Sequence, residues 1–232
     1  MLPSNGIFQA AFWSVLTIGL YVGGKVLYRR RPRWWLSPLV VAPLLLIAAA
    51  LCLHETYGEY IRGTHWLVAL LAPATVSFAV PIYEQRQLIR RHWPLLVMGM
   101  LAGSASSMAS AWALSNILGL DDGIRLSLLP RSLSTPFAMT VSGDIGGTPA
   151  LTAVFVVITG VLGAMIGEGL LNLLPLRSSV ARGALLGMGA HGAGTAKAYQ
   201  IDGEIGTIAG LVMVLVGMLN VLAAPLLAHV LR

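Results

Sequence analysis

Long apolar runs alternate with short polar or basic segments along the whole chain. A bilayer core about 30 Å thick needs roughly 20 mainly apolar residues for each helical pass. The pattern therefore predicts an all-α, polytopic membrane helix bundle with about seven transmembrane passes, without strands. The predicted passes are residues 7–27, 36–53, 65–83, 94–118, 149–174, 184–199 and 205–231.

The segment 126–148 is apolar but interrupted by prolines and glycines. Such interruptions free backbone groups, which must find partners inside the protein or in a water-filled cavity. If Arg91 and Arg177 lie on the same side of the membrane, this segment enters the bilayer and turns back. We therefore predict broken or re-entrant helices here.

A weak internal repeat relates residues 75–80 to residues 134–139. Each copy is followed by a polar loop and then by a proline, Pro94 or Pro149, that opens a long apolar helix. Paired broken segments indicate a transporter site at a repeat interface. A chance match between two apolar segments explains the similarity equally well, and a re-entrant segment does not follow simply from an inverted repeat.

Composition agrees with a bilayer environment. The 232 residues are 56% hydrophobic and only 10% charged, whereas soluble domains are about 25% charged. The net charge of +6 comes from clusters at 29–33, 86–91 and 177–182, between apolar runs, which argues against nucleic-acid binding. The positive-inside rule places these clusters in the cytoplasm and the N-terminus outside. The single cysteine, Cys52, allows no intrachain disulfide.

Hydroxyl side chains lie beside the prolines of both broken segments, and polar groups at membrane depth indicate function. They are Thr75 and Ser77 in the first segment, and Ser134 and Thr135 in the second. We interpret them as solute ligands. Hydrogen bonds to their own helix backbone are the alternative.

A glycine turn of Gly146, Gly147 and Thr148 precedes the helix expected from Pro149. Its N–H groups and the helix N-terminus favour an anion such as a carboxylate. Asp144 would repel that anion when ionised, so we assign it to proton coupling or to simple capping of the helix.

The stretch around His191 and Gly192 combines flexible backbone with ionisable side chains. His191 changes charge near neutral pH and is a second proton-coupling candidate, while Thr195 and Lys197 offer a hydroxyl and a cation to a carboxylate. Alternatively, Lys197 only extends to the interface and His191 only bonds a neighbouring helix. We predict that this stretch, the hydroxyls and the glycine turn surround one buried cavity.

Other patterns carry no site. Glycine pairs four residues apart indicate close helix packing, namely Gly99 with Gly103, Gly163 with Gly167 and Gly206 with Gly210. Metal-ligand spacing, a Ser-His-Asp order and a phosphate-binding loop are not visible in the sequence. We therefore expect neither an enzyme nor a cofactor.

Four blocks resemble the LrgB family, also called CidB or antiholin-like proteins: LAPATVSFAVPIYEQ (71–85), PRSLSTPFAM (130–139), IGGTPALTAVF (145–155) and AHGAGTAKA (190–198). The resemblance covers essentially the whole chain. Ala72 stands where the family usually has glycine, and Arg131 where it has lysine. The resemblance implies a single transmembrane domain, 1–232, with scaffold helices in 1–63 and a transport core in 64–232.

The family resemblance implies two functions. The first is transport of small 2-hydroxy or 2-oxo monocarboxylates of the glycolate, glycerate, pyruvate or lactate class, coupled to protons. A plastid relative resembles a glycolate/glycerate translocator. The alternative is an antiholin-like protein that modulates murein hydrolase export and autolysis. The implied partners are a carboxylate solute, the lipid bilayer of the bacterial inner membrane, further copies of the chain and an LrgA/CidA-type membrane protein.

Overall fold

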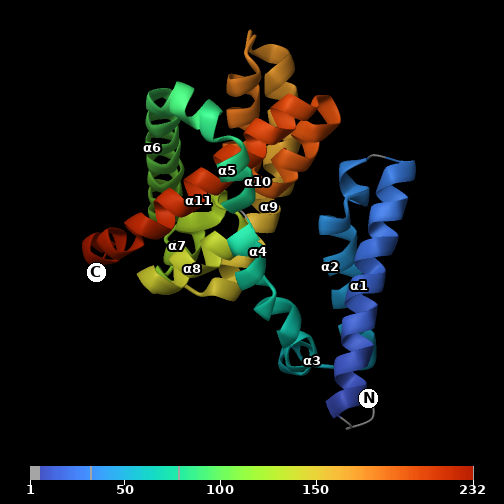
Figure 1. Cartoon of the computed structure of the whole chain (residues 1–232). Coiled ribbons are helices and arrows are strands. Elements are labelled where there is room, and N and C mark those ends of the chain that lie inside the picture. Colours follow the sequence, from blue (N-terminus) through green and yellow to red (C-terminus); the bar gives the residue numbers. More distant parts are fainter. Residues whose placement is uncertain (1–5, 32, 78, 232) are drawn as a thin grey trace. The chain divides into compact units, whose positions relative to one another are not determined.

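The computed structural model describes residues 6–31, 33–77 and 79–231, and this part of the chain consists of helices and connecting turns without strands (Figure 1). Contacts divide it into two compact units, residues 1–74 and 75–232. The expected boundary between residues 63 and 64 falls inside a helix of the first unit, and the functional division of the chain stays a prediction.

The first unit contains α1 (Gly6–Arg30), the short 3-10 helix η1 (Trp34–Leu36), α2 (Pro38–Leu53) and α3 (Tyr57–Ala69). Trp13 of α1 is fully buried, with its ring edge-on to Tyr60 of α3 at 5.4 Å. Ser14 donates to the Gly63 carbonyl and accepts from the indole of Trp66, at 3.2 and 2.8 Å. These aromatic and hydroxyl contacts hold α1 against α3.

The second unit carries most of the buried apolar residues. Its C-terminal helices α10 and α11 pack together, with α9 on α10 and α8 on α11. Leu186 and Ile208 are among the most deeply buried residues in it. The helices of this unit are α4 (Leu71–Ser77, which straddles the boundary), α5 (Ala79–Glu84), α6 (Arg86–Ile117), α7 (Asp122–Leu128), η2 (Leu129–Ser132), α8 (Thr135–Ile145), α9 (Pro149–Leu173), α10 (Ser179–Ile201) and α11 (Gly203–Leu231).

Five segments are long and apolar enough to cross a membrane: α1, the run α3 to α5, α6, α9 and α11. The 16-residue α2 is shorter but equally apolar. These six segments match six of the predicted passes, and the remaining one corresponds to α10. The prediction of an all-α polytopic membrane bundle is confirmed.

Prolines and glycines break the helices at most of the expected places, but Pro94, expected to open a helix, lies inside α6 just after a kink at His92. Pro73 and Pro81 are each the third residue of a short helix, α4 or α5, where a missing N–H leaves no bond unmade. Segment 126–148 forms the end of α7, then η2 and α8, rather than one long helix. Phe78 of the weak repeat lies outside the described residues, and the repeat itself stays a prediction.

Candidate functional site

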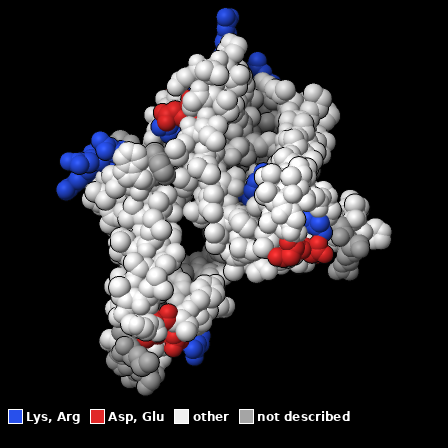
Figure 2. All heavy atoms as spheres, turned by 180° about the vertical axis from the view of Figure 1, so that it is seen from behind, with Lys and Arg blue, Asp and Glu red and all other residues white. Residues whose placement is uncertain are grey.

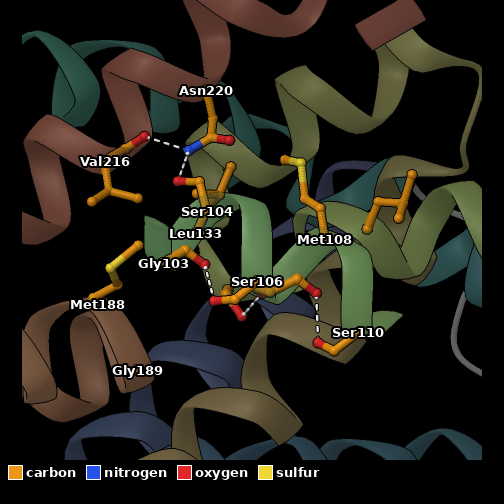
Figure 3. Close-up of a pocket in the computed structure, with 13 residues that line it drawn as sticks. Gly103, Ser104, Ser106, Met108, Ser110, Leu133, Met188, Gly189, Val216 and Asn220 are labelled. Atoms are coloured by element: carbon orange, nitrogen blue, oxygen red, sulfur yellow. Dashed lines mark hydrogen bonds between the residues drawn. The ribbon is translucent and has the colours of Figure 1, made fainter. Parts of the chain in front are cut away.

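A pocket of about 440 Å³, lined by both polar and apolar residues, lies between α6, η2, α10 and α11 (Figure 3). All of its walls belong to the second unit. Six polar residues line it together with an apolar remainder that includes Met108 and Val216. The polar residues are Ser104, Ser106, Ser107 and Ser110 of α6, Ser132 of η2 and Asn220 of α11.

Asn220 fixes one wall of this serine pocket. Its side chain is 3% exposed, and its Nδ2 donates to Ser104 Oγ at 2.9 Å and to the Val216 carbonyl at 2.8 Å (Figure 3). A serine hydroxyl can accept and donate at once. Because Ser104 accepts from Asn220 and donates to no described residue, its O–H remains available to a bound solute.

Ser132 of η2 offers a second available hydroxyl. Ser107 donates to Ser132 Oγ at 2.7 Å, which leaves the Ser132 O–H without an acceptor in the described chain. Ser106 and Ser110 instead donate to α6 carbonyls, those of Gly103 and Ser107. Ser104 and Ser132 are therefore the hydroxyl donors that the pocket can present.

Arg131 supplies a positive charge beside this wall. The residue directly precedes Ser132 and is only partly exposed, and its Nη1 donates to the Ser107 carbonyl at 3.4 Å. No carboxylate of the described residues forms an ion pair with it. An arginine within a membrane bundle is costly unless it is paired or hydrated. Its charge is available to an anion.

Helix α10 breaks next to the pocket. Met188 and Gly189 line the pocket, and His191 has φ 37° and ψ −119° inside an otherwise helical run. The His191 residue is 4% exposed, and its ring lies against Gly160 of α9 and beside the backbone of Arg131. Its Nε2 has no partner in the described chain. The break in α10 therefore lies beside the backbone of Arg131.

The predicted glycine turn is engaged within the protein. Gly147 N–H donates to the Ser142 carbonyl at 2.8 Å, and Thr148 N–H donates to Ser127 Oγ at 2.7 Å. The Thr152 hydroxyl lies within hydrogen-bond distance of the Ser127 carbonyl and of Ser142 Oγ, at 2.9 and 2.7 Å. The N–H groups expected to receive a carboxylate already have acceptors. Gly146, with φ 90°, caps α8, and the role of the turn in binding stays a prediction.

The predicted residues on α10 occupy different environments. Lys197 pairs with Glu168 of α9 at 2.8 Å, and Thr195 faces Met213 of α11 at 3.9 Å. Gly192 is exposed beside the buried His191. The cation expected for the solute is thus already neutralised by a carboxylate.

The other predicted residues are also dispersed. Ser134 is 7% exposed at the start of α8, and its Oγ has no described partner; Thr135 follows it and is partly exposed. Thr75 lines a different hollow on the unit, while Ser77 and Asp144 are exposed. The structure thus places the predicted set at several sites rather than around one cavity, and their roles as ligands stay predictions.

The sequence is similar to proteins of a known family. The sequence profile of the LrgB-like family matches residues 17–230. The chain belongs to the LrgB-like family. Among its relatives are the uncharacterized proteins YwbG and YxaC of Bacillus subtilis, 40% and 34% identical over 91% of this chain and over 94% and 92% of those proteins. The holin-like protein CidB of Staphylococcus aureus is 30% identical over 96% of this chain and 97% of its own length. No solved structure matches the chain.

Sequence reasoning missed the pocket of this LrgB-family protein. Ser104, Ser107 and Ser110 recur every three residues along the apolar α6, a spacing that puts them on one helix face and that could have revealed the site. Asn220 is a polar residue in the apolar α11 and carries a similar signal. Their meeting could not be predicted, since it requires α6 and α11 to be neighbours.

Proposed function

We propose that this membrane protein transports small 2-hydroxy or 2-oxo monocarboxylates of the glycolate, glycerate, pyruvate or lactate class. The serine pocket is the proposed solute site. The observation that supports it is the combination of two available hydroxyl donors, Ser104 and Ser132, with Arg131, a cation without a described carboxylate partner.

The chemistry of the pocket suits such a solute. A carboxylate accepts hydrogen bonds from hydroxyls and from a guanidinium, and bonds of this charge-assisted kind are stronger than neutral ones. The 2-hydroxy or 2-oxo oxygen of the solute is a further acceptor. It can accept from whichever of Ser104 and Ser132 does not bind the carboxylate. Met108 and Val216 can contact the short carbon chain. The pocket, together with Arg131 next to its lining residue Ser132, therefore offers each part of a two- or three-carbon hydroxy acid a matching partner.

Uptake by liposomes that contain only this chain tests the proposal, with labelled glycolate, pyruvate and lactate as solutes. Ser132→Ala should raise the half-saturating concentration about ten- to hundredfold, because a hydrogen bond to a charged group contributes roughly 1.5–3 kcal/mol. Ser106→Ala is the matched control, since its hydroxyl donates to its own helix. If the folded protein in detergent binds none of the three acids and the liposomes take up none, the proposal is wrong.

The same assay separates the two candidate cations. Arg131→Ala should weaken solute binding about ten- to hundredfold through the lost charge-assisted bond. The sequence-based hypothesis expects the strong loss from Lys197→Ala and from His191→Ala instead. Arg29→Ala, in the exposed first basic cluster, should change nothing. If Lys197→Ala weakens solute binding and Arg131→Ala does not, the solute carboxylate binds near Lys197 and Glu168 and not in the serine pocket.

A holin-like function is the second candidate, because the relative CidB is named holin-like. Such a protein modulates a membrane lesion, murein hydrolase export and autolysis, and it requires association faces rather than a solute pocket. Release of a large entrapped dye from the same liposomes would favour it. Selective passage of small carboxylates, with the dye retained, would favour transport.

Further expectations belong to this proposal. His191 is the preferred proton carrier over Asp144, because it is buried and its Nε2 has no described partner, whereas Asp144 is exposed. Loss of pH-gradient-driven uptake in His191→Gln, with exchange of solute retained, would support coupling. We also propose that the protein resides in the bacterial inner membrane. It forms a homodimer or larger homo-oligomer, whose mass light scattering can measure. It associates with an LrgA/CidA-type partner, which co-purification can detect.

A further inference from the structure

A second hollow of the second unit has a different chemistry from the serine pocket. This groove, of about 650 Å³, is walled mainly by apolar side chains and carries two arginines. Val76 and Met218 expose 73% and 44% of their surface along it. Its lining consists of Thr75, Val76, Ala79, Ile82, Tyr83, Arg86, Ile89, Arg90, Phe137 and Met218, from α4, α5, α6, α8 and α11.

The two arginines form a pair on one face of α6. Arg86 and Arg90 are four residues apart, one helical turn, and both are exposed. Arg86 Nη1 donates to the Tyr83 carbonyl at 2.9 Å, and its guanidinium lies 4.4 Å from the centre of the Tyr83 ring. Neither arginine forms an ion pair within the described chain. The groove thus has two unneutralised positive charges beside its apolar walls.

We infer that this groove binds one anionic phospholipid, with the headgroup phosphate on Arg86 and Arg90 and an acyl chain along the apolar walls. Charge complementarity decides the occupant, because guanidinium groups pair with phosphate oxygens and the walls suit a hydrocarbon chain. A short carboxylate solute would leave most of those walls uncovered. The positive-inside rule puts the arginines on the cytoplasmic side, where they meet the anionic lipid surface.

This inference stands apart from the proposed solute site. It uses no residue of the serine pocket, and it gives Thr75 an environment of lipid rather than of solute. Failure of carboxylate transport would leave it intact, and failure of lipid binding would leave the transport proposal intact.

Native mass spectrometry of the full-length chain, extracted from bilayers of equal parts phosphatidylglycerol and phosphatidylcholine, tests the inference. The unchanged chain should retain phosphatidylglycerol in preference. Arg86→Ala/Arg90→Ala should weaken retention about thirtyfold, since each arginine near an anionic lipid surface contributes about fivefold. Arg91→Ala/Arg177→Ala is the matched control, because it removes two exposed positive charges that do not line the groove.

A steric variant tests the acyl-chain part and guards against misfolding of the double variant. Ala79→Trp fills the groove while all charges remain, and it should lower retention of phosphatidylglycerol by at least about tenfold. Each of four results would overturn the inference. The unchanged chain could retain the two lipids equally, or the control variant could lose as much phosphatidylglycerol as Arg86→Ala/Arg90→Ala. Ala79→Trp could retain the lipid unchanged, or inorganic phosphate could displace it.

Discussion

His191 occupies a backbone conformation that L-residues with a side chain avoid. Its φ of 37° interrupts α10, and glycines at 189 and 192 flank it without taking the strained position. Strain of this kind, roughly 1–3 kcal/mol, persists where surrounding structure enforces it and gathers at functional sites. Here the buried ring, against Gly160 and the Arg131 backbone, enforces it. The residue thus connects the helix break with the proposed solute site.

Two substitutions at this residue separate the backbone from the side chain. His191→Gly and His191→Ala both remove the imidazole, but only glycine accepts the left-handed conformation freely. We expect His191→Gly to be more stable than His191→Ala by about 1–2 kcal/mol. Thermal unfolding in one detergent measures the difference. At Ala196, in the exposed helical part of α10, glycine should instead be less stable than alanine, so Ala196→Gly should lower the stability by about 1 kcal/mol. If alanine is the more stable residue at 191, the helix is not broken there.

At the scale of the element, glycines decide how closely α9 and α10 approach. A Cβ on Gly163 would lie 2.5 Å from the Gly189 carbonyl oxygen of α10, closer than real Cβ atoms come. Gly167 approaches Leu186 in a similar way. This pair was predicted from its spacing to be a packing face, and the contacts confirm that; a Cβ on Gly99, of another predicted pair, would meet nothing within 4 Å. The contact also positions Gly189, which lines the serine pocket.

Gly163→Ala should therefore push α9 from α10 and lower the melting temperature of the protein. The substitution overpacks a tight contact, for which about 1–3 kcal/mol is a typical cost. Gly169→Ala on the same helix is the control, because a Cβ there meets nothing within 4 Å. Alanine in an open helical position stabilises by roughly 0.5–1 kcal/mol. Thermal scans of both variants should thus move in opposite directions, and equal shifts would contradict the close packing.

The elements were easier to predict from the sequence than the site was. The thickness of the bilayer sets the length of apolar runs, so α1, α6, α9 and α11 follow from hydrophobicity alone. Prolines and glycines likewise marked segment 126–148 as broken. The exact break at His191 depends on its contacts with α9 and η2, which no local pattern contains. Lys197 looked like a free cation because Glu168 lies on another helix.

At the scale of the whole molecule, charge is sparse and localised. Figure 2 shows wide uncharged areas with lysines, arginines and acidic residues gathered in a few small groups. Exposed apolar side chains such as Val76, Ile117 and Leu222 cover much of the helices. A surface of this kind is stable against lipid tails and not against water, which agrees with the membrane protein that the family assignment indicates.

The number of membrane crossings leads to the last prediction. Two apolar segments, α2 and the run α3 to α5, separate Arg31 from Arg90. The helices α6 and α9 separate Arg90 from Arg177, together with the broken segment. Helix α8 has 11 residues, and at about 1.5 Å per residue it is roughly 16 Å long, half of the hydrocarbon core. If the broken segment does not cross, all three arginines face the cytoplasm.

Single cysteines test this arrangement in a Cys52→Ala background. Arg31→Cys, Arg90→Cys and Arg177→Cys should resist a membrane-impermeant maleimide in intact cells and react after permeabilisation. Glu55→Cys, in the polar segment between α2 and α3 that the positive-inside rule places outside, should react in both conditions. Reaction of Arg177→Cys alone in intact cells would mean that residues 122–145 cross the bilayer. That result would put η2 and Arg131 in a spanning segment, which needs a partner for the arginine at membrane depth. Reaction at all three arginines, with Glu55→Cys protected, would instead invert the whole topology and place the phospholipid groove in the outer leaflet.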